Sequence, residues 1–253
     1  MTLTIVVWTL CTVLGAGLAV GAAVWLGRSA RSVEGSFTPQ ALTFAGGVVL
    51  SSFVLVTGFL IVGAWQLQSV ARSHAHEEAR VLAKAYARAG ELAPQDRDAI
   101  RDRITVYTRS VVDDEWPDLA KHRASPTSWE QLDAVQSALA AVPADRREAA
   151  YDATSAALDE VYVKRYARLA DLDSVSPPIL FGVMVAAGLL VLVYPPLVGM
   201  TANLRNIAVL GLAGAVVGFG ILLVFQLRDP FTAPLNVGPS AFQAALDRYA
   251  QLK

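Results

Sequence analysis

An uncharged apolar segment from Ala41 to Trp65 constrains the fold of this chain more than any other feature of its 253 residues. The segment is about 25 residues long, and a helix needs about 20 apolar residues to cross the hydrocarbon core of a bilayer. Hydroxyl groups nevertheless interrupt it, at Thr43, Ser51, Ser52 and Thr57. Lipid alone does not require these polar groups. The segment therefore predicts either a membrane anchor or the wall of a path through the membrane.

The composition of the chain favours a membrane protein. Hydrophobic residues make up 54% of the sequence and charged residues 17%, which is too apolar and too poor in charge for an ordinary soluble domain. The formal net charge is −1, without the basic excess that is typical of nucleic-acid binding. We therefore expect a lipid bilayer as a partner, and no nucleic acid. Cys11 is the only cysteine, so an intrachain disulfide is impossible.

Three further apolar segments predict membrane helices, at about residues 3–26, 177–198 and 207–226. Between the second and third spans lies the only hydrophilic block, in which apolar residues recur at helical spacing and no segment alternates with period two. The expected fold is an all-α membrane protein with four transmembrane helices in two pairs. Its parts are a first helix pair, a helical soluble block, a second helix pair and a soluble tail, at residues 1–65, 66–175, 176–226 and 227–253.

Four spans would place both chain ends on the same side of the membrane as the block. The arginines of the short links are Arg28, Arg31 and Arg205, and more basic residues flank the block near the ends of the spans. Because positive charge near span ends favours the cytoplasm, we expect a multi-pass protein of the cell membrane with the block and both termini in the cytoplasm.

Helix-breaking residues divide the block into several predicted helices. No breaker separates the second span from residues 66–89, which predicts one long helix that leaves the membrane. Pro94 is well placed in the first turn of the next helix. Pro117 makes Trp116 an expected helix end, and Thr127–Glu130 has the pattern of a capping box that opens another helix.

The four expected spans contain no Asp, Glu, Lys, Arg or His. Proton relays and voltage sensors need ionisable groups within the membrane, so this composition disfavours a pump or a voltage-driven device and leaves a passive pore. The sequence also lacks G-x-S-x-G, the Walker loop, H-E-x-x-H and the Rossmann fingerprint. We therefore expect neither an enzyme nor a cofactor.

Two groups of polar residues carry side chains that can bind metal ions. His74 and His76 lie about 200° apart around a helix and cannot share one ion. Asp113-Asp114-Glu115 could supply oxygen ligands to Ca²⁺, yet a run of charge beside a helix end is usually solvated. The sequence therefore predicts no metal site.

Two faces of the second span combine small or polar groups: one is formed by Thr43, Gly47 and Ser51, the other by Val49, Phe53 and Thr57. Such faces can pack inside a helix bundle, because hydroxyls bond back to their own helix and glycines allow close contact. Alternatively, one face forms a pore wall in a symmetric oligomer, with Phe53 as a hydrophobic constriction that controls wetting. The pattern leaves both interpretations open.

Short motifs in the order found here resemble the bacterial bestrophin-like domain family, which comprises multi-pass membrane proteins of largely undetermined function. The order is two spans, a helical block, two spans and a D-P-F tail, and it covers nearly the whole chain. The matching residues are Glu78-Ala79 with Leu82, Tyr107 with Glu115-Trp116-Pro117, and Asp229-Pro230-Phe231.

The resemblance implies an ion channel, because the distantly similar bestrophins are pentameric anion channels whose second membrane helix lines a hydrophobic neck. Ser52-Phe53-Val54-Leu55 followed by Gly58-Phe59 looks like that helix. The expected function is a homo-oligomeric channel, with a pentamer favoured, an inorganic anion as the permeant species, and a pore lined by Val49, Phe53 and Thr57. The tail lacks the acidic run of the bestrophin Ca²⁺ clasp, so the resemblance does not imply that Ca²⁺ gates this chain.

The motif residues are expected to have structural or gating roles; they are Glu78, Glu115, Trp116, Asp229, Pro230 and Phe231. Carboxylates at Glu78 and Glu115 can tie the block together if arginines or backbone donors hold them. Asp229 precedes a proline and is expected to cap the turn of the tail. The alternative function is a non-conducting membrane scaffold or sensor whose helical block binds a protein partner.

Overall fold

A computed structural model describes residues 39–174, 178–198, 200–201, 203–232 and 236–252, together with Gly17 and Gly21. These residues form helices and connecting turns, and no strand occurs among them. The chain divides into two compact units, one formed by Met1–Trp65 with Ser176–Arg228 and the other by Gln66–Val175 with Asp229–Lys253. We call them the membrane unit and the block unit.

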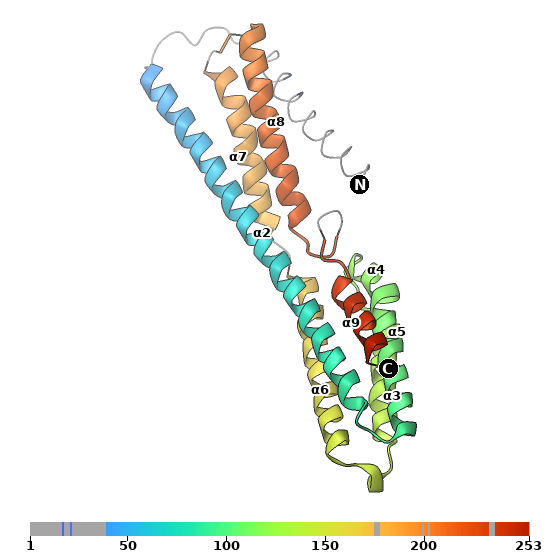
Figure 1. Cartoon of the computed structure of the whole chain (residues 1–253). Helices are drawn as coiled ribbons and strands as arrows, with labels where there is room; N and C mark the ends of the chain where they lie inside the picture. Colours follow the sequence, from blue (N-terminus) through green and yellow to red (C-terminus); the bar gives the residue numbers. More distant parts are fainter. Residues whose placement is uncertain are drawn as a thin grey trace. The chain divides into compact units, whose positions relative to one another are not determined.

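One long helix, α2 (Pro39–Ala89), contributes its first half to the membrane unit and its second half to the block unit (Figure 1). It continues without interruption for 51 residues. The second half is rich in Ala, Arg, Glu and Lys, which have high helix propensity, so the helix does not end where the apolar segment ends. The prediction of one long helix is confirmed.

In the membrane unit, the first half of α2 packs with α7 (Pro178–Leu197) and α8 (Leu204–Leu227). Their buried apolar side chains form one cluster, which consists of Phe53, Leu60, Met184, Leu192, Leu210, Val217 and Val224. Gly188 allows the close approach, since a Cβ atom there would lie 2.8 Å from Val217 Cγ1 and 3.2 Å from Phe53 Cε2. Small residues at such contacts are typical of helix packing in membranes.

By length and composition, three helices of the described chain are apolar enough to cross a membrane, and they are α2, α7 and α8. The spans expected at residues 41–65, 177–198 and 207–226 coincide with them. The span expected at residues 3–26 lies outside the described residues, apart from Gly17 and Gly21.

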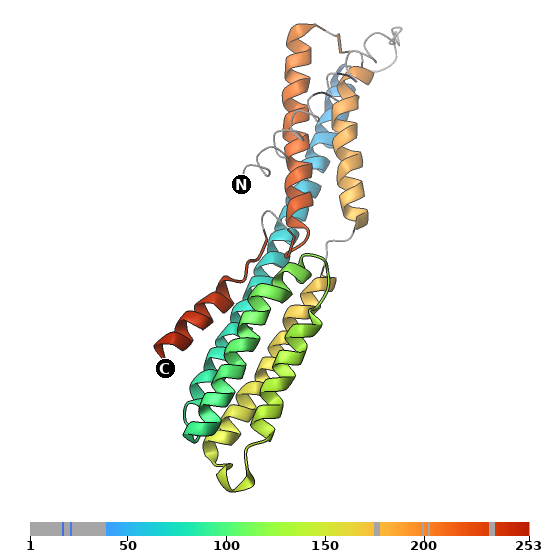
Figure 2. The same cartoon turned by 90° about the vertical axis from the view of Figure 1, so that its right-hand side faces the viewer.

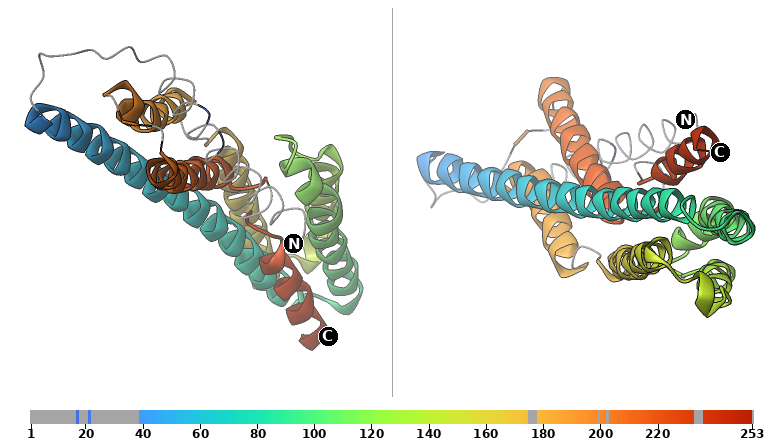
Figure 3. Two further views of the ribbon diagram at one scale, coloured as in Figure 1. Left: turned by 90° about the horizontal axis from the view of Figure 1, so that it is seen from above. Right: turned by 60° about the horizontal axis from the view of Figure 1, so that its bottom comes forward.

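In the block unit, the second half of α2 forms a bundle with α3 (Pro94–Ser110), α5 (Pro126–Ala140), α6 (Ala149–Ala170) and α9 (Ser240–Gln251) (Figure 2). Figure 3 shows α6 beside that half of α2. Short 3₁₀ turns, η2 (Ala144–Arg146) and η3 (Asp171–Asp173), flank α6. The helices share one apolar core, whose larger side chains include Leu82, Ile104, Leu132, Leu158 and Phe242.

A π-helical turn, η1 (Val111–Glu115), joins α3 to α4 (Trp116–Leu119). In it the N–H of Trp116 donates to the carbonyl of Val111, five residues earlier. Pro117 has no N–H to donate, and a proline ring crowds the carbonyl four residues before it. The wider turn gives the ring room. The prediction that the helix ends at Trp116 is therefore wrong, because the chain stays helical to Leu119.

The starts of two other helices test the remaining predictions for the block. Pro94 occupies the first turn of α3, as predicted. Helix α5 begins at Pro126 and no side chain caps its first turn, so the capping box expected at Thr127–Glu130 is wrong. Ser128 is buried instead, and its hydroxyl lies 3.2 Å from that of Ser110 on α3. The serine joins two helices rather than ending one.

Candidate pore face and buried charge cluster

The first half of α2 buries one stripe of side chains against its own chain. Phe53 is 5% exposed and Thr57 is 9% exposed. The Phe53 ring lies against Gly188 of α7, and both side chains approach Gly220 of α8. Val49 is half-buried. The three residues expected to line a pore thus lie on the side of α2 that faces α7 and α8.

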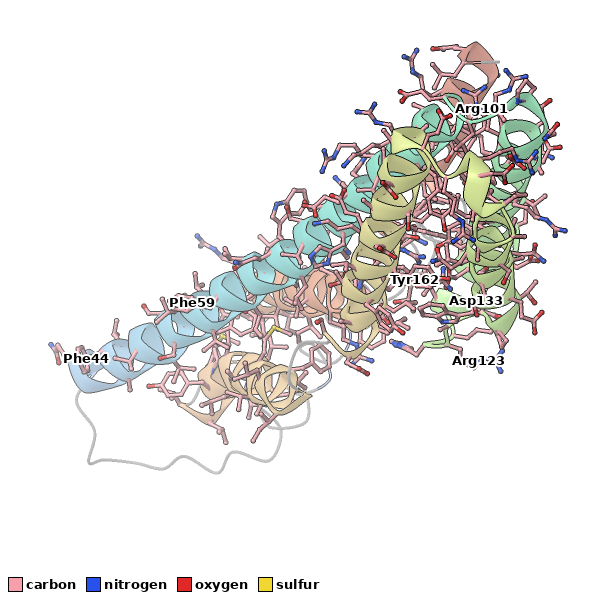
Figure 4. The ribbon with its side chains drawn as sticks, turned by 90° about the horizontal axis from the view of Figure 1, so that it is seen from below. Phe44, Phe59, Arg101, Arg123, Asp133 and Tyr162 are labelled. Carbon is pink, nitrogen blue, oxygen red and sulfur yellow. The ribbon has the colours of Figure 1, made fainter. Side chains whose placement is uncertain are left out.

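The opposite side of α2 carries large apolar side chains that the described part of the chain leaves exposed. Leu55 is 61% exposed, Val62 65% and Phe59 71%. At about 100° per residue, positions 51 and 55 lie about 160° and 200° around the helix from Phe53. Figure 4 shows Phe59 on the side of α2 away from α7. We call the stripe Phe44, Val48, Ser51, Leu55, Phe59 and Val62 the uncovered face.

A shallow groove of about 450 Å³ lies on the uncovered face. Its lining combines bulky, small and hydroxyl-bearing residues, namely Phe44, Gly47, Val48, Ser51, Ser52 and Leu55. The serine hydroxyls can donate and accept hydrogen bonds. A helix face that met only lipid tails would need neither the hydroxyls nor the glycine. This groove is therefore the best candidate for the wall of a path.

The second candidate site is a set of four ionised side chains inside the block unit, which we call the buried charge cluster. Glu78 of α2, Glu115 of η1 and Arg165 and Arg168 of α6 are all 0% exposed. Arg168 Nε donates to Glu78 Oε2 at 2.6 Å, and its Nη2 donates to Glu115 Oε2 at 2.8 Å. Arg165 donates to both oxygens of Glu115, at 2.8 and 2.7 Å. The negative charges of the two carboxylates equal the positive charges of the two guanidinium groups, so the cluster has no net charge.

Tyr107 of α3 adds a hydroxyl to the buried charge cluster. It donates to Glu78 Oε1 at 2.6 Å and accepts a hydrogen bond of 2.8 Å from Arg165 Nη1. Burial, together with the charge of Glu78, raises the pKa of Tyr107 well above its usual value. The tyrosine therefore stays protonated and keeps donating, which links α3 to α2 and α6.

The arginines of the cluster stay charged although they are buried. Burial by itself lowers the pKa of Arg168, but the charges of Glu78 and Glu115 outweigh it and raise that pKa above its usual value. Aromatic rings cover the guanidinium groups, since Arg168 Cζ lies 5.4 Å from the Trp116 ring and Arg165 Cζ 4.3 Å from a Trp129 ring. The cluster is thus a fixed ionic tie between four elements.

Local sequence explains how the four charges meet. Arg165 and Arg168 are three residues apart and share one face of α6. The π turn points Glu115 inward, while Asp113 and Asp114 remain exposed. Arginines or backbone groups were the expected donors to Glu78 and Glu115, and the structure shows arginines, which the sequence did not identify. The signal was present: Leu158, Val161, Arg165 and Arg168 form one helical stripe, and all four are buried.

The tail motif connects to the same region through Trp116. Asp229 Oδ1 accepts the backbone N–H of Phe231 at 2.9 Å, so the prediction that Asp229 caps the tail turn is confirmed. The Pro230 carbonyl accepts the N–H of Val237 at 2.8 Å. The Phe231 ring meets Trp116 edge-on at 6.2 Å, and Trp116 Nε1 donates to the Val237 carbonyl at 2.8 Å. Trp116 therefore contacts both the tail and Arg168.

The polar residues considered for metal binding are arranged otherwise. Within the described ranges, no group of three His, Cys, Asp or Glu side chains could hold a metal ion. His74 Nδ1 lies 2.9 Å from Asp171 Oδ2, whereas His76 is exposed. Glu115 faces the arginines rather than its acidic neighbours. His74 and Glu115 therefore serve contacts within the fold.

Comparison with known proteins places the arrangement among membrane proteins. A family model described as the Bestrophin-like domain matches residues 11–242. Two crystal structures of substituted forms of a bacterial bestrophin homologue from Klebsiella pneumoniae are similar to the whole chain. Their TM-scores are 0.71 and 0.72 at 13% identity, and the matches cover 98% of this chain and 98% and 96% of those chains.

A further structure of that Klebsiella homologue, phased with zinc, has a TM-score of 0.67 at 13% identity and 98% coverage of both chains. No curated protein sequence matches the chain. At this level of identity the structural likeness concerns the fold.

Proposed function

Because the chain belongs to the Bestrophin-like domain family, we propose that it is a homo-oligomeric ion channel, a pentamer with α2 around the axis. The observation that carries the proposal is the uncovered face of α2, which is uncharged, bears the exposed Ser51 and is not used in packing against α7 or α8. Repeated around a symmetry axis, this face would enclose a narrow path lined by hydroxyl and apolar groups.

Within this proposal, Ser51, Leu55 and Val62 line the path. Lining by Val49, Phe53 and Thr57 would require α7 or α8 to move aside, because Phe53 lies against Gly188 and Gly220 of its own chain. The uncovered face needs no such movement, which supports it as the lining. Leu55 and Val62 would then form the hydrophobic constriction.

The groups along α2 favour an anion as the permeant species. The hydroxyls of Ser51 and Ser52, which line the groove, can donate hydrogen bonds to an anion. The apolar half of α2 contains no carboxylate that would attract a cation. The first charged side chain beyond that half is Arg72, which is exposed. A positive charge there raises the local concentration of anions.

The proposed setting is the cell membrane, with the lipid bilayer around the apolar helices and the block unit and both termini in the cytoplasm. The basic residues near the ends of the spans support this orientation. It also places Arg72 at the cytoplasmic end of the path.

Chloride flux through liposomes that contain the purified full-length protein tests the proposal. We expect flux from the wild-type protein, and a several-fold higher flux from Leu55→Ala, because a smaller side chain widens the constriction and eases its wetting. Val54→Ala is the matched control, since Val54 is 59% exposed but lies about 100° from Leu55 around the helix. Its flux should equal that of the wild type.

Two results would contradict the proposal in different ways. Vesicles that stay tight to every ion gradient would exclude the channel and favour the scaffold or sensor. A flux that changes in Phe53→Ala and not in Leu55→Ala would indicate that Val49, Phe53 and Thr57 line the path instead.

A further inference from the structure

Two histidine–aspartate pairs lie next to the points where the chain passes between the block unit and the membrane helices. Asp171 is the first residue of η3, between α6 and α7, and it pairs with His74 of α2. Asp229 directly follows Arg228 at the end of α8, and it pairs with His122. Both pairs belong to the block unit.

The His74–Asp171 pair encloses a carboxylate that burial makes costly to ionise. His74 Nδ1 lies 2.9 and 3.1 Å from the two oxygens of Asp171, whose side chain is 7% exposed. Burial raises the pKa of Asp171 above its usual value, and the hydrogen bond and charge of His74 act against that rise. The carboxylate therefore depends on a cationic partner.

The other charged groups near this pair are already engaged. Arg168, one turn earlier on α6, acts on Asp171 through its charge, but its hydrogen bonds go to Glu78 and Glu115. Glu77 acts on His74 from the same helix, and it pairs with Lys164 of α6 at 2.7 Å. His74 is thus the side chain whose charge most directly decides the strength of the contact to Asp171.

The His122–Asp229 pair has a similar construction. His122 Nε2 lies 2.8 Å from Asp229 Oδ2, and the aspartate side chain is 9% exposed. His122 has a φ angle of 55°, in the left-handed region that side chains other than glycine seldom adopt. Such a conformation persists where the surrounding contacts hold it. The salt bridge to Asp229 is one such contact.

Charged neighbours of this second pair also have partners of their own. Lys121 and Arg123, on either side of His122, both contact Asp118, at 2.9 and 3.4 Å. On the side of the tail, the Arg228 guanidinium lies 4.7 Å from the Phe225 ring. The contact to Asp229 therefore depends on His122.

We infer that the two pairs are proton-sensitive contacts that regulate the proposed channel. Protonated histidines attract the carboxylates of Asp171 and Asp229, and loss of the protons as pH rises weakens both contacts. Histidine changes charge between pH 5 and 8. A protonated imidazole adds a Coulomb attraction to its hydrogen bond with a carboxylate, and this attraction is lost with the proton. Asp171, which follows α6, and Asp229, which directly follows α8, gain freedom to move when these contacts weaken.

The sign of the pH dependence follows from the histidines. The imidazolium–carboxylate attraction is present while histidine is protonated and is lost when the proton leaves as pH rises. This loss makes the block unit more stable at pH 5.5 than at pH 7.5, and it gives the higher flux at pH 7.5.

The third histidine supplies a matched control for a test in the full-length protein. We compare the wild type, the double variant His74→Gln with His122→Gln, and His76→Gln, which alters an exposed histidine on the same helix as His74. The readouts are the thermal unfolding midpoint in detergent and the chloride flux in liposomes, each at pH 5.5 and 7.5. Wild type and His76→Gln should show a higher midpoint at pH 5.5 and a several-fold higher flux at pH 7.5. The double variant should lose most of both differences.

The pH dependence of the midpoint does not rest on the proposed function, whereas the effect on flux does. An equal pH dependence in the double variant and the wild type would overturn the inference, as would its loss in His76→Gln or a higher flux at pH 5.5. If no protein gives chloride flux in liposomes but the double variant alone loses the pH dependence of the midpoint, the channel proposal is wrong and the proton-sensitive contacts are supported. If the double variant does not fold, Asp171→Asn, which keeps a hydrogen-bonding group without the charge, should show a reduced pH dependence.

Discussion

The two halves of α2 belong to one helix but are covered in opposite ways. Between Phe44 and Trp65, bulky apolar side chains such as Phe59 and Val62 are exposed, whereas between Gln66 and Ala89 the only large apolar side chain that is exposed is Val70. Backbone geometry is the same throughout, so the surroundings differ. Within a membrane, apolar side chains that their own chain leaves uncovered can face lipid or a neighbouring subunit, whereas in water they are buried.

The halves also differ in what holds their neighbours. The first half meets α7 and α8 through close contacts at glycines, and Gly188 receives both Phe53 and Val217. The second half meets α3, η1 and α6 through the buried charge cluster around Glu78. In lipid the hydrophobic effect does not drive helices together, so their association depends on close van der Waals packing. In the block unit an apolar core is present, and the ionic tie adds a specific arrangement.

Breaking the ionic tie should have the largest effect. Arg168→Met leaves Glu78 and Glu115 buried with one cationic partner fewer, which costs about 3–5 kcal/mol. For a chain of this size we expect the thermal unfolding midpoint in detergent to fall by about 10 °C. Lys84→Met is the control, because its pair with Glu160 is exposed and worth at most about 1 kcal/mol. Equal effects of the two substitutions on the midpoint would contradict the distinction between buried and exposed ion pairs.

Overfilling the glycine contact should have an intermediate effect, on the other half of α2. In Gly188→Leu the new Cβ would meet Val217 Cγ1 at 2.8 Å, and overpacking of this kind costs about 1–3 kcal/mol. We expect the unfolding midpoint to fall by about 5 °C. Gly182→Leu on the same helix has no atom within 4 Å of its Cβ and should leave the midpoint unchanged. A similar loss in both variants would mean that Gly188 is not a packing contact.

Removing one hydrogen bond between the tail and the block should have the smallest effect. Trp116→Phe deletes the Nε1–H that donates to the Val237 carbonyl at 2.8 Å and keeps most of the ring contact with Phe231. The expected cost is about 1 kcal/mol, which lowers the unfolding midpoint by about 3 °C. Tyr166→Phe is the control, since Tyr166 is 63% exposed. An unchanged midpoint in Trp116→Phe would show that the tail contact adds no stability.

Local patterns in the sequence predicted much of the fold. The uncharged segments anticipated the apolar half of α2 together with α7 and α8, because a helix must be long and apolar to cross a bilayer. Pro94 marked the start of α3. The Glu78 and Glu115 motifs predicted carboxylates held by arginines or backbone donors, and the donors are Arg165 and Arg168. Each of these signals lies within a few turns of one helix.

Other features could not be predicted locally. Pro117 indicated a helix end, yet a π turn carries the helix past it. Thr127–Glu130 matched a capping box, yet Ser128 bonds to Ser110 on another helix. In both cases a contact with a neighbouring element outweighs the propensity of the local sequence. A π turn that buries Glu115 is favourable only because two arginines of α6 donate hydrogen bonds to its carboxylate.

The segment Ala41–Trp65 shows how the two kinds of information divide. Its composition by itself determined that this part of the chain is an apolar helix with polar groups on more than one face, since length and the absence of charge depend on the sequence alone. Which face turns inward was decided only by the tertiary structure. Phe53 packs at Gly188 and Gly220, and this leaves Ser51 and Leu55 on the uncovered face. Helical periodicity gives both faces similar patterns, and only the glycines of two distant helices distinguish them.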